Sequence, residues 1–216
     1  MEPQAWMQEL ETLRAEKLRL VVEPGRPTSG QTGGDARALL TIALANEVNV
    51  SDLVALWAPT TPELEVKLAF ARQAGDEANH YLLVAERMKA LGFDPDGFAM
   101  PKPSPLFLFL RSLSGTVDRI AAGLFALESI AYGVNENFIR WCEQRGDRET
   151  ARIYAEYIQP DERAHQELGR KLLLKYATTA ELQSRAEQAM TTTFEIASQA
   201  RSSTAQKIGV AAFPGC

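Results

Sequence analysis

Both histidines of this 216-residue chain end the same five-residue pattern, Asp-Glu-x-x-His. The first copy places Glu77 three residues before His80, and the second places Glu162 three residues before His165. Residues three apart lie on one face of an α-helix, so each pair can offer one carboxylate oxygen and one imidazole nitrogen to a single metal ion. The repeat therefore predicts two helices that face each other across a two-metal site.

Two isolated glutamates in apolar surroundings supply the remaining candidate ligands. Glu47 lies in the apolar stretch 43–50, and Glu128 is the only charged residue between Ile120 and Val134. An ionised carboxylate on an apolar helix face is costly unless it is paired or binds a metal. A two-metal bundle needs such carboxylates from two helices besides those that carry the Glu-x-x-His pairs. The predicted metal ligands are Glu47, Glu77, His80, Glu128, Glu162 and His165.

The aspartate of each pattern is a candidate partner for a ligating histidine. Such a histidine usually donates its second N–H group to a carboxylate or a carbonyl. We expect the contacts to cross between the two helices, with Asp76 bonded to His165 and Asp161 bonded to His80. An alternative interpretation, in which both aspartates cap distorted turns near Gly75 and Pro160, stays open.

The hydrophobic periodicity and the breaker residues predict an all-α fold in a single domain, 1–216. Prolines and glycines mark loops at 22–34 and 92–105, and the residues after 211 read as a frayed tail. Pro59 should end one helix, and Thr61-Pro62 should begin the next. Pro160 should bend the helix that contains it. The expected helices span residues 3–20, 35–57, 62–91, 106–113, 116–144, 147–176 and 179–206.

Composition narrows the function classes. The formal net charge of −5 argues against a general nucleic-acid binder. The chain contains no run of 18 apolar residues, so we expect no membrane-spanning helix. The acidic N-terminal residues predict no secretion signal, and two distant cysteines predict neither a disulfide framework nor a zinc motif. We therefore expect a cytoplasmic protein that needs neither nucleic acid nor membrane.

The six candidate ligands, in this order, resemble those of the ferritin-like di-iron carboxylate superfamily, over residues 35–177. The resemblance implies a four-helix bundle with a long crossover between its second and third helices. The first and last predicted helices would be additional to that core, and they could either cover it or form a homodimer face. The resemblance also implies two iron ions, or manganese at one or both positions. Glu77 and Glu162 would bridge the ions, with Glu47 and Glu128 as more terminal ligands.

Among the branches of this superfamily, the chain looks most like the oxygenases and hydroxylases. Rubrerythrins carry a second glutamate where this chain has Ala131, and the ribonucleotide reductase small subunit carries a tyrosine where it has Val84. The implied function is an O2-activating oxidoreductase that acts on a small organic substrate and receives electrons from a reductase. The alternatives are a ferritin- or rubrerythrin-like oxidase, peroxidase or iron-handling protein, and a metal-stabilised bundle without activity. Candidate pocket residues are Ala43, Leu44, Phe70, Leu124, Phe125 and Tyr132.

Overall fold

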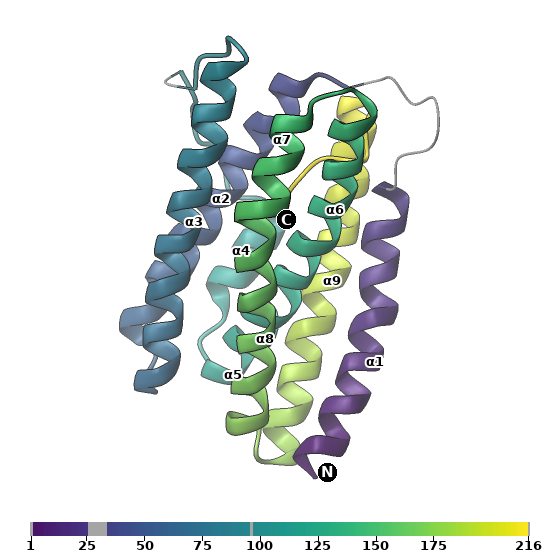
Figure 1. Ribbon diagram of the computed structural model, residues 1–216. Helices are drawn as coiled ribbons and strands as arrows, with labels where there is room; N and C mark the ends of the chain where they lie inside the picture. Colours follow the sequence, from purple (N-terminus) through teal and green to yellow (C-terminus); the bar gives the residue numbers. More distant parts are fainter. Residues whose placement is uncertain (1, 26–33, 96, 216) are drawn as a thin grey trace.

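The computed structural model describes residues 2–25, 34–95 and 97–215, and over these ranges the chain is helical with no strand. Long helices lie side by side in a bundle (Figure 1). The all-α prediction is therefore confirmed at the level of a helical bundle. The elements are α1 (Pro3–Val22), η1 (Glu23–Gly25), α2 (Ala36–Thr60), α3 (Leu64–Ala90), α4 (Pro105–Ser112), α5 (Thr116–Arg119), η2 (Ile120–Leu127), α6 (Glu128–Gln144), α7 (Arg148–Ile153), η3 (Tyr154–Ile158), α8 (Gln159–Tyr176) and α9 (Ala180–Ile208).

Helices α2 and α3 form a hairpin with the most extensive contacts between any two elements of the described chain. Helix α2 ends within the break expected at 58–60, but it includes Pro59 and continues to Thr60, three residues beyond the expected end at 57. The hydroxyl of Thr61 donates to the carbonyl of Trp57 at 2.9 Å, so this carbonyl finds a partner in the last turn. The start of α3 also differs from the expectation, since the helix begins at Leu64, after Pro62.

The helix expected at 116–144 is helical throughout but contains a segment with wider turns. Between α5 and α6, the segment η2 is a π-helix of eight buried residues. The backbone N–H of Glu128 donates to the carbonyl of Gly123, five residues earlier. Gly123 is required here because a Cβ atom would lie 2.7 Å from the ring of Trp57. Such π turns are rare in proteins, and those that occur are often found at functional sites.

A second π segment, η3, connects α7 to α8. The backbone N–H of Gln159 donates to the carbonyl of Tyr154, and Pro160 follows at once in the first turn of α8. Proline has no backbone donor, and at the start of a helix none is needed. The proline therefore follows a π turn directly, and the bend expected at this position stays a prediction.

Helices α1 and α9 cover the opposite side of the bundle from the α2–α3 hairpin (Figure 1). Lys17 and Glu195 join them through an ion pair of 2.9 Å, and their apolar faces enter the main core. The expected loop at 22–34 begins with η1, and its residues 26–33 lie outside the described ranges. Among the described residues, α2 is the one helix long and apolar enough to cross a membrane, and more than half of its most apolar stretch is buried in the bundle.

The prediction of a frayed C-terminal tail is wrong for residues 212–215, which are buried. In Figure 1 the last described residues, drawn in yellow, run back from the end of α9 toward the middle of the picture. Arg201 donates to the carbonyls of Gly215 and Phe213, each at 2.7 Å, and its guanidinium lies 3.9 Å from the centre of the Phe213 ring. Asn46 of α2 donates to the carbonyl of Pro214 at 3.3 Å, and Asn135 of α6 accepts from the backbone of Gly215 at 3.0 Å. The tail thus fills space between three helices.

Candidate metal centre

Four helices bring the six predicted ligands together in the interior. Glu47 comes from α2, the first Glu-x-x-His pair from α3, Glu128 from the start of α6 and the second pair from α8. Each of the six residues is at most 5% exposed. Their potential ligand atoms fall into two groups, and within each group all atoms lie within 4.8 Å of one another. The groups are Glu47, Glu77, His80 and Glu162, and Glu77, Glu128, Glu162 and His165.

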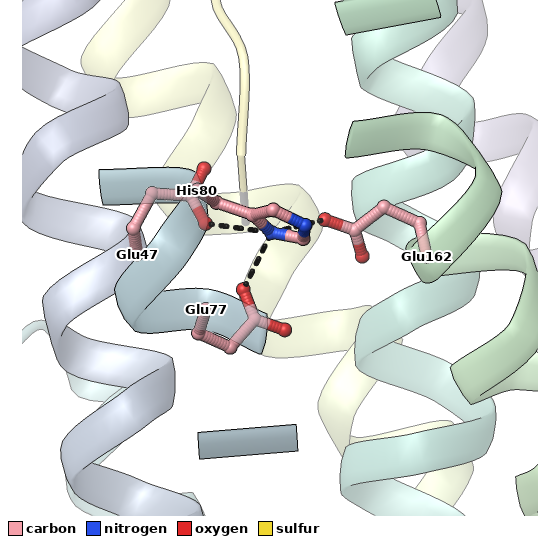
Figure 2. Close-up of side chains that lie close together, drawn as sticks. All are labelled: Glu47, Glu77, His80 and Glu162. Carbon is pink, nitrogen blue, oxygen red and sulfur yellow. Dashed lines mark hydrogen bonds and ion pairs between the residues drawn. The ribbon is translucent and has the colours of Figure 1, made fainter. Parts of the chain in front are cut away.

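The first group surrounds Nδ1 of His80 (Figure 2). Carboxylate oxygens of Glu77, Glu47 and Glu162 lie 3.2, 3.6 and 3.8 Å from this nitrogen. All four side chains point toward one another from three helices, α2, α3 and α8. One imidazole nitrogen and three carboxylates could therefore hold a metal ion here.

The second group repeats this arrangement around His165. Its Nδ1 atom lies 3.5 Å from Oε1 of Glu77 and 3.7 Å from Oε2 of Glu128. The other oxygen of Glu77, Oε2, is the one that faces His80. The carboxylate of Glu77 is thus placed between the two histidines, with one oxygen toward each. Glu162 also belongs to both groups, so the two candidate sites share two carboxylates.

The aspartates cross between the two histidine-bearing helices. Asp161 of α8 lies 3.3 Å from Nε2 of His80, and Asp76 of α3 lies 3.0 Å from Nε2 of His165. The pairs are those expected from the sequence, and they differ from the alternative in which the aspartates only cap turns. With Nε2–H donating to an aspartate, the lone pair of each Nδ1 atom points into the cluster and is available to a metal.

The buried carboxylates carry perturbed proton affinities. Burial raises the pKa of Glu128 from 4.5 to about 8. Burial, followed by repulsion from Glu162, raises the pKa of Glu77, and burial together with Glu128 raises that of Glu162. Burial alone would lower the pKa of His80, but the carboxylates of Glu47 and Glu77 outweigh it and raise that pKa to about 12. Without a cation, the raised pKa values of Glu77, Glu128 and Glu162 favour protonated carboxyl groups, and a metal would displace these protons.

Several atoms at the centre have no hydrogen-bond partner among the described residues. These buried atoms are Oε1 of Glu77, Oε2 of Glu162 and Nδ1 of His165. A buried polar atom without a partner is costly, and most such atoms in proteins are satisfied. Two carboxylate oxygens and an imidazole nitrogen without partners, all within the cluster of candidate ligands, fit a bound cation.

Gln73 is part of the site, although the sequence patterns did not single it out. It is 1% exposed on α3, one turn before Glu77, and its Nε2 atom donates to Oε1 of Glu128. Its own oxygen has no partner among the described residues. Its position four residues before Glu77 places it on the same helix face, and this spacing could have identified it from the sequence. The bond links α3 to α6 and orients the Glu128 carboxylate.

Tyr154 of η3 is buried, and its hydroxyl has no hydrogen-bond partner in the described chain. Its ring packs edge-on against Phe138 at 4.9 Å. Burial and then the charge of Glu47 raise the pKa of Tyr154 well above its usual value.

Five of the six residues proposed as pocket walls are packed into the cores. Each of the five is at most 1% exposed, namely Ala43, Leu44, Phe70, Leu124 and Phe125. Tyr132, the sixth, is half-buried and lines a shallow surface depression with Gln159 and Arg163. A cavity of about 180 Å³ lies on another face of α2, beside Asn46 and Phe213, and includes none of the six ligands. The role of these six residues as pocket walls stays a prediction.

Comparison of the chain with protein-family models, with curated proteins and with solved structures gave no match in any of the three. The assignment of the site therefore depends on its own residues and geometry.

Proposed function

We propose that this chain is a ferritin-like di-metal protein and that its activity is O2-dependent oxidation by a pair of iron ions. The observation that supports this most directly is the sharing of Glu77 and Glu162 between two groups that each contain one histidine and one further glutamate. The proposed four-helix core consists of α2, α3, α6 with its π segment, and α8. The connection from α3 to α6, which contains α4, would be the long crossover.

The donor set favours iron or manganese over softer metals. It consists of hard carboxylate oxygens and borderline imidazole nitrogens. It contains no thiolate, because Cys142, the cysteine within the described residues, belongs to a separate apolar cluster. When bound, two irons would supply redox chemistry and a place for O2. Manganese at one or both positions remains compatible with the same donors.

The residues of the chain have distinct tasks in this proposal. Glu77 and Glu162 would bridge the ions, while Glu47 and Glu128 would each complete the ligand set of one ion. Each histidine would bind through Nδ1 and keep a proton on Nε2, held by Asp161 for His80 and by Asp76 for His165. Glu128 would lose the proton that burial favours, so metal binding would release protons. The wholly buried segment η2 would exclude water from the Glu128 side of the centre.

A small organic substrate would distinguish a hydroxylase or oxygenase from the rival activities. Such an enzyme would need an external electron donor, in effect a reductase, because a chain with two cysteines carries no iron–sulfur motif.

The tight packing around the ligands favours the principal rival, a ferritin- or rubrerythrin-like oxidase, peroxidase or iron-handling protein. The apolar side chains expected to form a pocket leave little exposed surface, and the 180 Å³ cavity does not include the ligands. Iron, O2 and peroxide are small enough to need no such pocket.

Stopped-flow spectroscopy of anaerobically iron-loaded protein tests the proposal. We expect rapid oxidation when O2 is mixed in, and a change of rate or a hydroxylated product with one member of an aldehyde, acyl-CoA and aromatic panel. Glu128→Ala should abolish the rapid phase, while Glu143→Ala, an exposed change on the same helix, should keep it. Mineralisation of many irons per chain without organic turnover would favour the rival, and slow oxidation equal to that of free iron would refute both.

A further inference from the structure

The outer face of α3 carries an exposed apolar stripe with the spacing of a helix-pairing seam. Three leucines on this stripe, Leu64, Leu68 and Leu82, are 67%, 59% and 57% exposed. Between them, Ala71, Gly75 and Ala78 are also exposed. The six positions are separated by 4, 3, 4, 3 and 4 residues, the heptad spacing that keeps one stripe facing a partner helix.

The stripe has no partner among the residues that the structure describes. Helix α3 packs on α2 and touches α8, and Figure 1 shows it at the outer edge of the bundle. Its metal-binding residues occupy the inner face. A Cβ atom at Gly75 would meet nothing within 4 Å. Glycine inside a helix is destabilising by roughly 0.5–1 kcal/mol relative to alanine, so the fold of one chain gives no reason for it.

The order of side chains along the stripe is self-complementary about position 73. In an antiparallel pairing with a second copy, Leu64 would meet the partner's Leu82, and Leu68 would meet the partner's Ala78. At the middle, Ala71 would meet the partner's Gly75. A two-fold interface requires this kind of self-complementarity, because the same patch serves on both subunits. Small residues at the crossing and large ones toward the ends also suit two helices that meet at an angle.

We propose that this seam is a homodimer interface in which two α3 helices pair in antiparallel fashion. The stripe spans 18 residue steps, or about 27 Å, along the helix. Leu56 of α2, which is 52% exposed near the same end of the hairpin as Leu64, would add to the buried area. Arg72 flanks the middle of the seam and lies 3.8 Å from Asp76 of its own helix. The Asp76 carboxylate offsets the charge repulsion that would arise between the Arg72 side chains of the two copies. The interface would place the two metal centres on opposite sides of the paired helices.

Sedimentation equilibrium of the whole protein tests the dimer. We expect twice the mass of one chain at micromolar concentration. Leu68→Glu should raise the dimer dissociation constant by at least about tenfold, since a charge would be buried against the partner's alanine. Leu108→Glu is a matched control, because Leu108 of α4 is also 59% exposed and lies off the seam. A monomeric wild-type protein, or an equal effect of the two variants, would overturn the proposal.

Disulfide trapping tests the antiparallel order. In a Cys216→Ser background, a mixture of Leu64→Cys and Leu82→Cys chains should give a cross-linked dimer of one chain of each kind. Each variant alone should cross-link far less. Efficient cross-linking of Leu64→Cys with itself would show a parallel pairing and overturn this arrangement, even if the protein is dimeric. Neither result depends on metal content or activity.

Discussion

Asp161, on α8, lies 3.3 Å from the Nε2 atom of His80, on α3, and the reciprocal contact joins α3 to α8 at His165. Each helix therefore supplies the residue that orients the other helix's histidine. Because Nε2 is engaged in both, both rings present Nδ1 to the carboxylates. The arrangement couples the packing of two helices to the direction of two metal-binding nitrogens.

Replacing the outer aspartates should weaken metal binding without removing a ligand. Loss of such a partner typically costs about 10- to 100-fold in metal affinity, and we expect this for Asp161→Ala. The weakened position should be the one that contains His80, so one of two binding steps should change in calorimetric titration with manganese. Asp52→Ala, an exposed change on α2, is the control. Two unchanged binding steps in Asp161→Ala would contradict the role given to this residue.

The stability of the metal-free protein should fall as the pH rises. Because the pKa of Glu128 is raised in the folded state, from 4.5 to about 8, this residue stabilises the fold below pH 4.5, and the contribution is lost as the pH rises through 8. The raised pKa values of Glu77 and Glu162 act in the same direction. Each proton held only by the folded state contributes a slope of about 1.4 kcal/mol per pH unit.

Urea unfolding of metal-free protein between pH 5 and 8 measures this slope. Glu128→Gln, which resembles the protonated carboxyl, should show a shallower fall over the same range. Saturating manganese should reverse the trend, since binding requires deprotonated carboxylates and becomes stronger at higher pH. Equal slopes in the wild type and in Glu128→Gln would contradict the raised pKa.

The six candidate ligands could be read from the sequence because their chemistry repeats at a local spacing. Glutamate three residues before histidine shares a helix face in any helix, so each pair is defined without knowledge of the fold. Glu128 stood out because its neighbours are apolar. The crossed aspartates followed from the position of each one beside a predicted ligand.

Other features depended on tertiary contacts that no local pattern carries. The π segments consist of ordinary helix-forming residues, and their wide turns are associated with the Trp57 ring against Gly123 and with Pro160. The sequence predicts a frayed C-terminal tail, yet Arg201 and Asn46 hold its carbonyls inside the bundle. Asn46 is distant from the tail in sequence, and Arg201 is separated from it by the end of α9.

The buried tail should contribute substantially to stability. Phe213 is 3% exposed and lies under the Arg201 guanidinium, so Phe213→Ala should destabilise the protein by roughly 3 kcal/mol, as truncation of a buried aromatic does. Leu20→Ala, at a site that is 57% exposed, should change stability by less than about 0.5 kcal/mol. Chemical denaturation measures both. A negligible effect of Phe213→Ala would mean that the tail is not held in the bundle.

The contact between α8 and η2 should be intolerant of even one added methyl group. A Cβ atom at Gly169 would lie 2.8 Å from Leu124 and 2.9 Å from the backbone nitrogen of Phe125. Gly169→Ala should therefore destabilise the protein by about 1–3 kcal/mol, because backbone on the far side has to move. Lys171→Ala, an exposed change on the same helix, should be nearly neutral in the same thermal unfolding assay. An unchanged or raised Tm for Gly169→Ala would contradict this packing.

Metal content per chain, measured by plasma mass spectrometry on protein loaded with iron under anaerobic conditions, tests the central claim most directly. We expect about two ions in the wild type, about one in Glu47→Ala, and close to none in Glu77→Ala, because Glu77 belongs to both groups of ligands and Glu47 to one. Circular dichroism should show a folded bundle in each variant. A wild-type content near zero after loading, or the same content in Glu77→Ala as in the wild type, would contradict the shared two-metal centre.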